Sequence, residues 1–183
     1  MAKQNIYDND TFFEGYSELR KREFNANTLF EIPALFSLMP DLSGKNVLDL
    51  GCGFGEHCKA FVEKGAEKVV GIDISEKMLE VAKKENSDPA IEYYNLPMED
   101  LDKVDGKFDI AVSSLAFHYV EEFSGLIKAI NEKLKEGGVL VFSQENPITS
   151  TYAGGERWTR DENGNKLYVN LSNYGREGER EST

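Results

Sequence analysis

Hydrophobic and polar positions follow two kinds of pattern along the chain, short apolar runs and helical spacing. Short apolar runs typical of buried strands occur in NVLDL, KVVGID, AIEYYN, KFDIAVSS and VLVFSQ, which begin at residues 46, 68, 90, 107 and 139. Between them, apolar residues recur at helical spacing over Gly55–Lys64, Glu76–Lys84 and Glu121–Lys135. Strands that alternate with helices predict right-handed crossovers and a parallel sheet.

Flanking residues indicate how these elements begin and end. The segment Thr11–Leu38 has helical spacing in two pieces, and Pro33 suits the first turn of the second piece. Ser75 is placed to cap the helix that follows it. Gly65 closes the first core helix, and Gly137-Gly138 is expected to end the last one.

After Gln144 the chain becomes polar and rich in glycine. Within this part, KLYVNLSNY alternates apolar and polar residues, which predicts one half-buried strand. We expect a single domain over residues 1–183, with a helical cap at 1–44, a core at 45–146 and a lid or tail at 147–183.

Composition and charge narrow the classes of function. The chain has 183 residues and a net charge of −12, which disfavours a broad basic surface for nucleic acid or an anionic membrane. No apolar run reaches membrane-spanning length, and the start lacks a signal-peptide core. Cys52 and Cys58 do not form a disulfide framework, so we expect free thiols and a cytoplasmic protein. Only His57 is near them, so we expect no metal site. The oligomeric state is left open.

A glycine loop follows the first predicted strand. Gly51, Gly53 and Gly55 lie within five residues, where the carboxyl end of a parallel strand meets its ligand. The spacing is one residue shorter than in the dinucleotide fingerprint, and Asp49 would oppose a pyrophosphate with like charge. A carboxylate there suits a cationic ligand such as S-adenosylmethionine (SAM). Asp73 ends the second strand, where a carboxylate accepts hydrogen bonds from ribose hydroxyls of either SAM or NAD.

Five segments, in this order, resemble the motifs of class I SAM-dependent methyltransferases. They are VLDLGCGFGEHCKAF, VVGIDISEKMLEVA, MEDL, FDIAVSSLAFHYV and LKEGGVLVFSQENPI. The likeness runs from Phe12 to Ile148 and is greatest to small bacterial enzymes of the ubiquinone/menaquinone-biosynthesis type. It implies an α/β fold, with a Rossmann-like, doubly wound, mostly parallel sheet, N-terminal helices and an irregular tail. It also implies SAM as cofactor and S-adenosylhomocysteine (SAH) as product.

The resemblance carries cofactor roles to particular residues. Gly51, Cys52 and Gly53 match the loop that wraps the methionine part of SAM, Asp49 matches the acid that orients its ammonium, and Asp73 matches the ribose ligand. The other matching residues lie at the ends of later elements or in the N-terminal helix. They are Ile74 and Met78 around the adenine, Met98 and Glu99 at its edge, Ser114 and Leu115 beside the methyl group, and Tyr16 and Arg20 as a cover, with Arg20 suited to the cofactor carboxylate.

The chain departs from the family pattern in three places. Pro97 occupies the position of an acid that binds the adenine amine in many relatives. Asn146 stands where a histidine is expected. The family sheet has seven strands, whereas this chain reaches Thr183 with room for one strand after the fifth. We therefore expect five parallel strands plus an irregular tail, in a chain that is truncated or lacks the last strands.

The implied activity is methyl transfer from SAM to an oxygen, nitrogen or carbon of a small molecule by in-line displacement. Alignment does most of this work, and His118 is the candidate general base if the acceptor must lose a proton. Two alternatives stay open: a nicotinamide-dependent oxidoreductase on a similar core, and a non-catalytic SAM-binding or interaction module. Binding of NAD would reveal the first, and absence of turnover the second.

Overall fold

The computed structural model describes residues 5–20, 26–146 and 157–172. The chain divides into two compact units, Met1–Gln144 and Glu145–Thr183. The first unit holds a sheet with its helices, and the second holds a small hairpin. No helix in the described ranges is long and apolar enough to cross a membrane.

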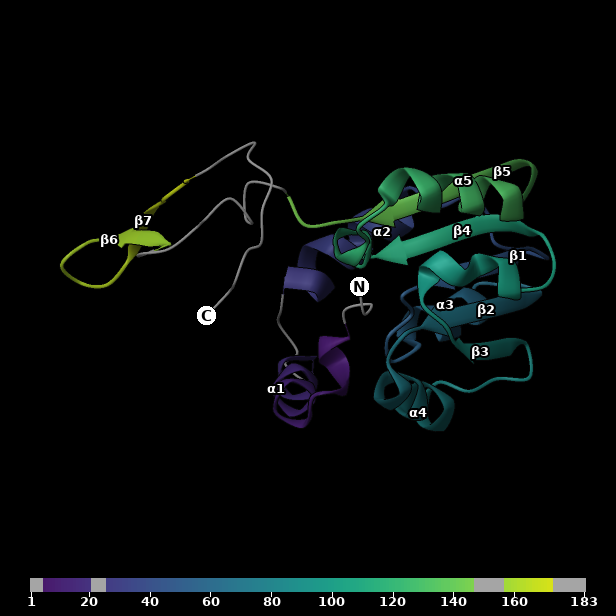
Figure 1. Cartoon of the computed structure of the whole chain (residues 1–183), viewed down its shortest axis with the longest axis horizontal. Coiled ribbons are helices and arrows are strands. Elements are labelled where there is room, and N and C mark those ends of the chain that lie inside the picture. Colours follow the sequence, from purple (N-terminus) through teal and green to yellow (C-terminus); the bar gives the residue numbers. More distant parts are fainter. Residues whose placement is uncertain (1–4, 21–25, 147–156, 173–183) are drawn as a thin grey trace. The chain divides into compact units, whose positions relative to one another are not determined.

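A five-stranded parallel sheet forms the centre of the first unit. Its order is β3-β2-β1-β4-β5, and the strands are β1 Asn46–Leu50, β2 Lys68–Asp73, β3 Ile91–Asn95, β4 Phe108–Ser114 and β5 Leu134–Ser143. Figure 1 shows β4 and β5 as neighbouring arrows that point the same way. The strand order reverses between β1 and β4, which is where ligands bind on such sheets. The predicted Rossmann-like fold is confirmed.

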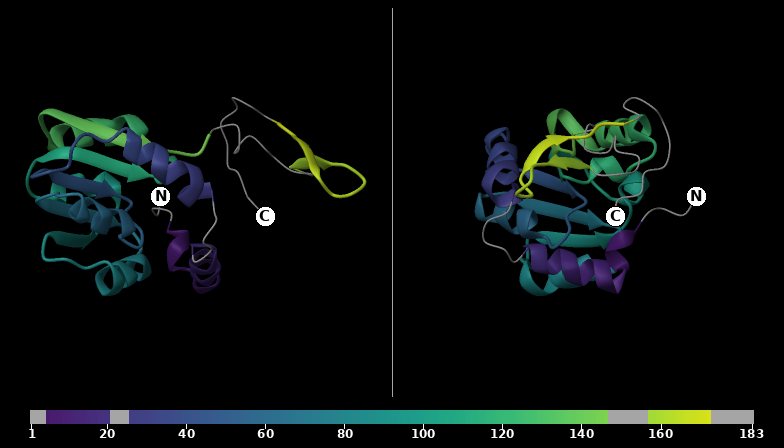
Figure 2. Two further views of the ribbon diagram at one scale, coloured as in Figure 1. Left: turned by 180° about the vertical axis from the view of Figure 1, so that it is seen from behind. Right: turned by 90° about the vertical axis from the view of Figure 1, so that its left-hand side faces the viewer.

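Helices cover both faces of this sheet because its central strands, β1, β2 and β4, are buried on both sides. The helical elements are η1 Ile6–Asp8, α1 Asp10–Arg20, η2 Asn27–Glu31, α2 Ile32–Ser37, α3 Glu56–Glu63, α4 Glu76–Glu85, η3 Met98–Lys103, η4 Phe117–Tyr119 and α5 Phe123–Lys133. Val47 in β1 packs with Phe61 of α3 in one core cluster, whereas the next residue, Leu48, packs with Ile130 of α5 in the other. This alternation places α2, α3 and α4 against one face and η3, η4 and α5 against the other. Figure 2 shows the helices on either side.

Several predicted element ends agree with the structure. β1 and β2 have the expected bounds, and Pro33 lies in the first turn of α2. The Ser75 hydroxyl accepts a hydrogen bond from the Met78 N–H at 3.2 Å, as expected of an N-cap.

The predicted boundary between the last core helix and strand is wrong. α5 ends at Lys133, and Gly137-Gly138 lies inside β5 instead of ending the helix. Pairing jumps from Phe108–Leu134 to Ile110–Val139, so the glycines belong to a bulged part of the strand. A Cβ on Gly138 would lie 3.1 Å from the Asp109 carbonyl, so this close backbone approach requires glycine.

The second unit contains an antiparallel hairpin of β6 Trp158–Arg160 and β7 Lys166–Val169. The predicted strand therefore exists, but its predicted half-burial is wrong, because all four β7 residues are exposed. The described part of this unit offers only a two-stranded ribbon, without a second layer to bury one face. The Lys166 ammonium lies 4.5 Å from the centre of the Trp158 ring and stabilises the ribbon.

Candidate cofactor site

The glycine loop after β1 is a tight turn with one open side. Gly51, Gly53 and Gly55 all have positive φ angles, of 76°, 53° and 76°. A Cβ on Gly51 would lie 2.6 Å from the Ala116 Cβ, whereas a Cβ on Gly53 would meet nothing within 4 Å. The loop is fixed to β2, since the Gly51 and Cys52 N–H groups both donate to the Ile72 carbonyl. The space beside Gly53 is therefore open, and we call this open side of the loop the cradle.

Asp73 ties this loop to the turn before α4. Its Oδ2 accepts a hydrogen bond from the Gly53 N–H at 2.8 Å, and its Oδ1 accepts one from the Ser75 N–H, also at 2.8 Å. Burial raises the pKa of Asp73, and these two N–H groups act in the opposite direction. The structure thus brings Asp73 and the loop together, as expected for neighbouring strand ends. Its role as the ribose ligand stays a prediction.

Asp49 is a buried carboxyl group behind the loop. It is 1% exposed, and the Cys58 thiol donates a hydrogen bond to its Oδ2 at 3.3 Å. Burial raises the pKa of Asp49 to about 6, against the effects of His57 and the Cys58 thiol. Burial also raises the pKa of Cys52 to about 11, which disfavours a thiolate there. The chemistry of this position favours a cation over an anion.

The stability difference between the wild type and Asp49→Asn is expected to depend on pH. Because the folded-state pKa of Asp49 lies above its ordinary value, the folded protein holds this proton more tightly than the unfolded chain. The wild type therefore loses free energy of unfolding, relative to the variant, as pH rises from about 4 to about 6. The loss amounts to roughly 2–3 kcal/mol. Urea unfolding of both proteins across this range measures it.

Asp41→Asn provides a control of opposite sign. Hydrogen bonds from Ser43 lower the pKa of this exposed carboxyl, so its contribution to stability is lost as pH falls instead of as it rises. A flat difference for Asp49→Asn between pH 4 and pH 6 would show that Asp49 does not titrate as a buried acid.

The N-terminal segment packs over the loop. The ring centres of Phe13 and Tyr16 lie 5.9 and 6.0 Å from that of Phe54. Asp8 accepts a hydrogen bond from the Ser75 hydroxyl at 2.5 Å, which attaches η1 to the start of α4. Tyr16 therefore lies near the loop, as its predicted covering role requires.

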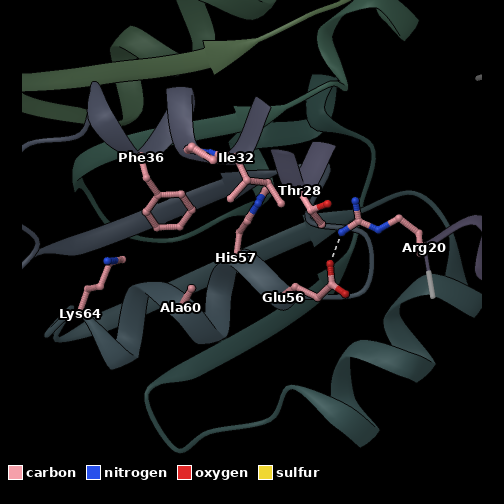
Figure 3. A pocket seen from close by; sticks show the side chains of 9 residues that line it. Arg20, Thr28, Ile32, Phe36, Glu56, His57, Ala60 and Lys64 are labelled. Atoms are coloured by element: carbon pink, nitrogen blue, oxygen red, sulfur yellow. Dashed lines mark hydrogen bonds and ion pairs between the residues drawn. The ribbon is translucent and has the colours of Figure 1, made fainter. Parts of the chain in front are cut away.

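Arg20 lies beside the loop but has a protein partner. Its guanidinium pairs with Glu56, the first residue of α3. Both residues line a pocket of about 460 Å³ between α2 and α3 (Figure 3). The rest of the lining is Thr28, Ile32, Pro33, Phe36, His57, Ala60 and Lys64. Among the predicted cofactor residues only Arg20 lines this pocket, so the pocket is a neighbour of the cradle and not the cradle itself.

The remaining predicted residues differ in their surroundings. Met98 is half-buried, and its Cε would lie 3.4 Å from a Cβ on Gly51, so it borders the loop. Met78 is buried in α4, Ile74 is half-buried, and Glu99 is exposed. His118 is also exposed, with its ring 4.4 Å from that of Tyr119.

The end of β4 is strained. Leu115 has a φ angle of 51°, the left-handed conformation that residues with a Cβ rarely adopt. Its N–H donates to the Ser143 carbonyl at 3.0 Å, which holds this backbone in place. Such outliers cluster at functional sites, and Ser114 and Leu115 are both predicted beside the methyl group.

Sequence reasoning missed one acidic residue here. Glu31 accepts hydrogen bonds from the side chains of Ser114 and Ser143, which lie 83 and 112 residues away along the chain. No local spacing marks such a contact. In the described ranges, no group of three or more His, Cys, Asp or Glu side chains is arranged to hold a metal ion.

Comparison with known proteins finds methyltransferases and one uncharacterized relative. Residues 48–142 match the family described as "Methyltransferase domain". The chain is 43% identical over 184 residues to an uncharacterized protein of Haemophilus influenzae, covering 97% of this chain and 72% of that one. It is 35% identical over 115 residues to a ubiquinone biosynthesis O-methyltransferase of Acinetobacter baylyi, covering 61% of this chain and 48% of the relative. The chain thus spans about half the length of that enzyme.

A solved structure with the same fold is an S-adenosylmethionine dependent methyltransferase from Mesorhizobium loti. Its TM-score is 0.68 at 38% identity, and the match covers 82% of this chain and 68% of that one. The family match and this solved structure agree with the predicted methyltransferase fold.

Proposed function

The chain belongs to the class I SAM-dependent methyltransferases, and from that premise we propose that it methylates an oxygen, nitrogen or carbon of a small molecule. The observation that carries this proposal is the loop of Gly51–Gly55, tied to Asp73 through the Gly53 N–H and backed by the buried Asp49. Family membership sets the chain apart from the nicotinamide-dependent oxidoreductases that the sequence left open.

The residues present fit SAM. Open space beside Gly53 gives room for the methionine part, and Asp49 offers a buried carboxyl group to a cation. Asp73 lies at the end of β2, where a carboxylate serves a ribose. When bound, SAM supplies a methyl group on a positively charged sulfur that leaves readily.

The protein itself aligns the acceptor with the methyl group, covers the site against water and accepts a proton where the acceptor must lose one. We assign the adenine surroundings to Ile74, Met78, Met98 and Glu99, and the methyl side to Ser114 and Leu115. The N-terminal helix, with Tyr16 and Arg20, excludes water from above the loop. Alignment of this kind is worth roughly 7–11 kcal/mol of the barrier. His118 is retained as a candidate base for an acceptor that loses a proton.

Calorimetric titration of the whole chain with SAM, SAH and NAD tests the cofactor. We expect SAM and SAH to bind and NAD not to bind, because Asp49 favours a cation and opposes a pyrophosphate. Binding of NAD alone would contradict the proposal. Turnover of SAM with small-molecule acceptors then separates an enzyme from a binding module, since a module would bind SAM without producing SAH.

A further inference from the structure

Glu31 joins the carboxyl ends of two neighbouring strands. Its Oε1 accepts a hydrogen bond from the Ser114 hydroxyl at 2.9 Å and another from the Ser143 hydroxyl. These serines are paired at the ends of β4 and β5. Glu31 itself is the last residue of η2, which has π-helical geometry. The N-terminal cap thus places a carboxylate at the carboxyl ends of the strands, where ligands bind on such sheets.

The second oxygen of this carboxylate lacks a partner. Glu31 Oε2 is buried from solvent and has no hydrogen-bond partner among the described residues. A buried acceptor without a donor costs roughly 1–3 kcal/mol, and more when it is charged. Such a group calls for an explanation, and a ligand that brings the missing donor is one.

Two irregular backbone features lie at the same place, the π-helical turn that ends at Glu31 and the conformation of Leu115. Isolated π-helical turns appear often at functional sites. Leu115, which follows Ser114, has the left-handed φ angle of 51°, and its N–H is shared between the Ser143 carbonyl and the Ser143 Oγ, the latter at 3.1 Å. An unpartnered oxygen, an irregular helix and a strained backbone therefore meet around one pair of serines.

We propose that Glu31 Oε2 receives the hydrogen of the group that is methylated, which makes the acceptor a hydroxyl or an amine and not a carbon. This inference rests on the proposed function. The acceptor's lone pair forms the new bond to the methyl carbon while the carbon–sulfur bond breaks and its electron pair stays on sulfur. The acceptor's proton passes to Oε2 and from there to water.

The position of Glu31 favours this role over two alternatives. His118 lies in η4 and is exposed, so it is less suited to a site that excludes water. The cofactor ammonium already has Asp49, a different carboxyl group on β1. Glu31 instead contacts Ser114, the strand end assigned to the methyl side.

Glu31→Gln tests the inference by binding alone. The amide oxygen can still accept from both serines, but an NH₂ donor replaces the unpartnered oxygen. The SAH complex of the whole chain is titrated by NMR with phenol, catechol and aniline. The matched probes anisole, 1,2-dimethoxybenzene and N,N-dimethylaniline lack the hydrogen. We expect the wild type to prefer a hydrogen-bearing probe over its partner by about 10-fold or more. Glu31→Gln should lose this preference and bind SAH as before.

Controls make each outcome decisive. Glu67→Gln, the same change at an exposed position, should keep the preference. A preference that persists in Glu31→Gln overturns the inference, as does a wild-type SAH complex that binds none of the probes. Loss of SAH binding in folded Glu31→Gln assigns the carboxylate to the cofactor and also overturns it, as does loss of the preference in His118→Ala alone. Failure of the wild type to bind SAH would instead overturn the proposed function.

Discussion

Replacing Asp73 with asparagine is expected to weaken SAM binding about 100-fold or more. One carboxylate oxygen becomes an NH₂ group, which then faces the N–H of either Gly53 or Ser75 with a donor against a donor. The loop loses its attachment to the turn before α4, and the ribose loses a charged acceptor. Calorimetric titration with SAM and SAH measures the change, and circular dichroism verifies that the variant is folded.

A matched control is Asp88→Asn. Asp88 accepts a hydrogen bond from the Ala90 N–H at 3.0 Å and pairs with Lys59, so the chemical change is the same, away from the loop. SAM affinity should be unaffected. Wild-type affinity in Asp73→Asn would remove Asp73 from the site and with it the ribose assignment.

The variants Gly51→Ala and Gly53→Ala are expected to lose different properties, the first stability and the second SAM binding. Both positions have a positive φ angle, which costs a residue with a Cβ about 1–2 kcal/mol. At Gly51 the new methyl group would also overlap Ala116, which adds about 1–3 kcal/mol of overpacking. Gly51→Ala should therefore be the less stable protein. Gly53→Ala should remain folded but bind SAM poorly, because its methyl group projects into the open cradle.

Urea unfolding and SAM titration of both variants separate the two effects. Gly106→Ala is the reference for backbone strain, since its φ angle is 96° and nothing lies within 4 Å of an added Cβ. Equal stability of Gly51→Ala and Gly106→Ala would show that Ala116 does not constrain the loop. Normal SAM binding by Gly53→Ala would show that the cofactor lies elsewhere.

Features encoded locally could be predicted from the sequence. The bounds of β1 and β2 follow from apolar runs ended by glycine and acid, and the loop with Asp49 and Asp73 follows from spacing along neighbouring strands. The α5–β5 border could not be predicted, because Gly137-Gly138 resembles a helix end and serves instead in a strand bulge near Asp109. The exposure of β7 could not be predicted either, because alternation does not reveal that residues 157–172 form only a two-stranded ribbon.

Contacts between distant segments were beyond such patterns. Glu31 is one acid among many in the sequence, and only the fold places it against Ser114 and Ser143. Asp8 likewise meets Ser75 across 67 residues. In both cases nothing in the neighbouring sequence marks the residue, and the fold determines which side chain it contacts.

The attachment of the N-terminal segment has a consequence for how a ligand enters. Segments η1 and α1 meet Phe54 and Ser75 through side chains and contribute no strand to the sheet. Detaching them breaks a few side-chain contacts, whereas melting the sheet breaks the whole hydrogen-bonded ladder. Local opening over the cradle therefore costs much less free energy than global unfolding. For a cofactor bound at the proposed site, we expect exchange to need only this local opening, while the sheet stays intact.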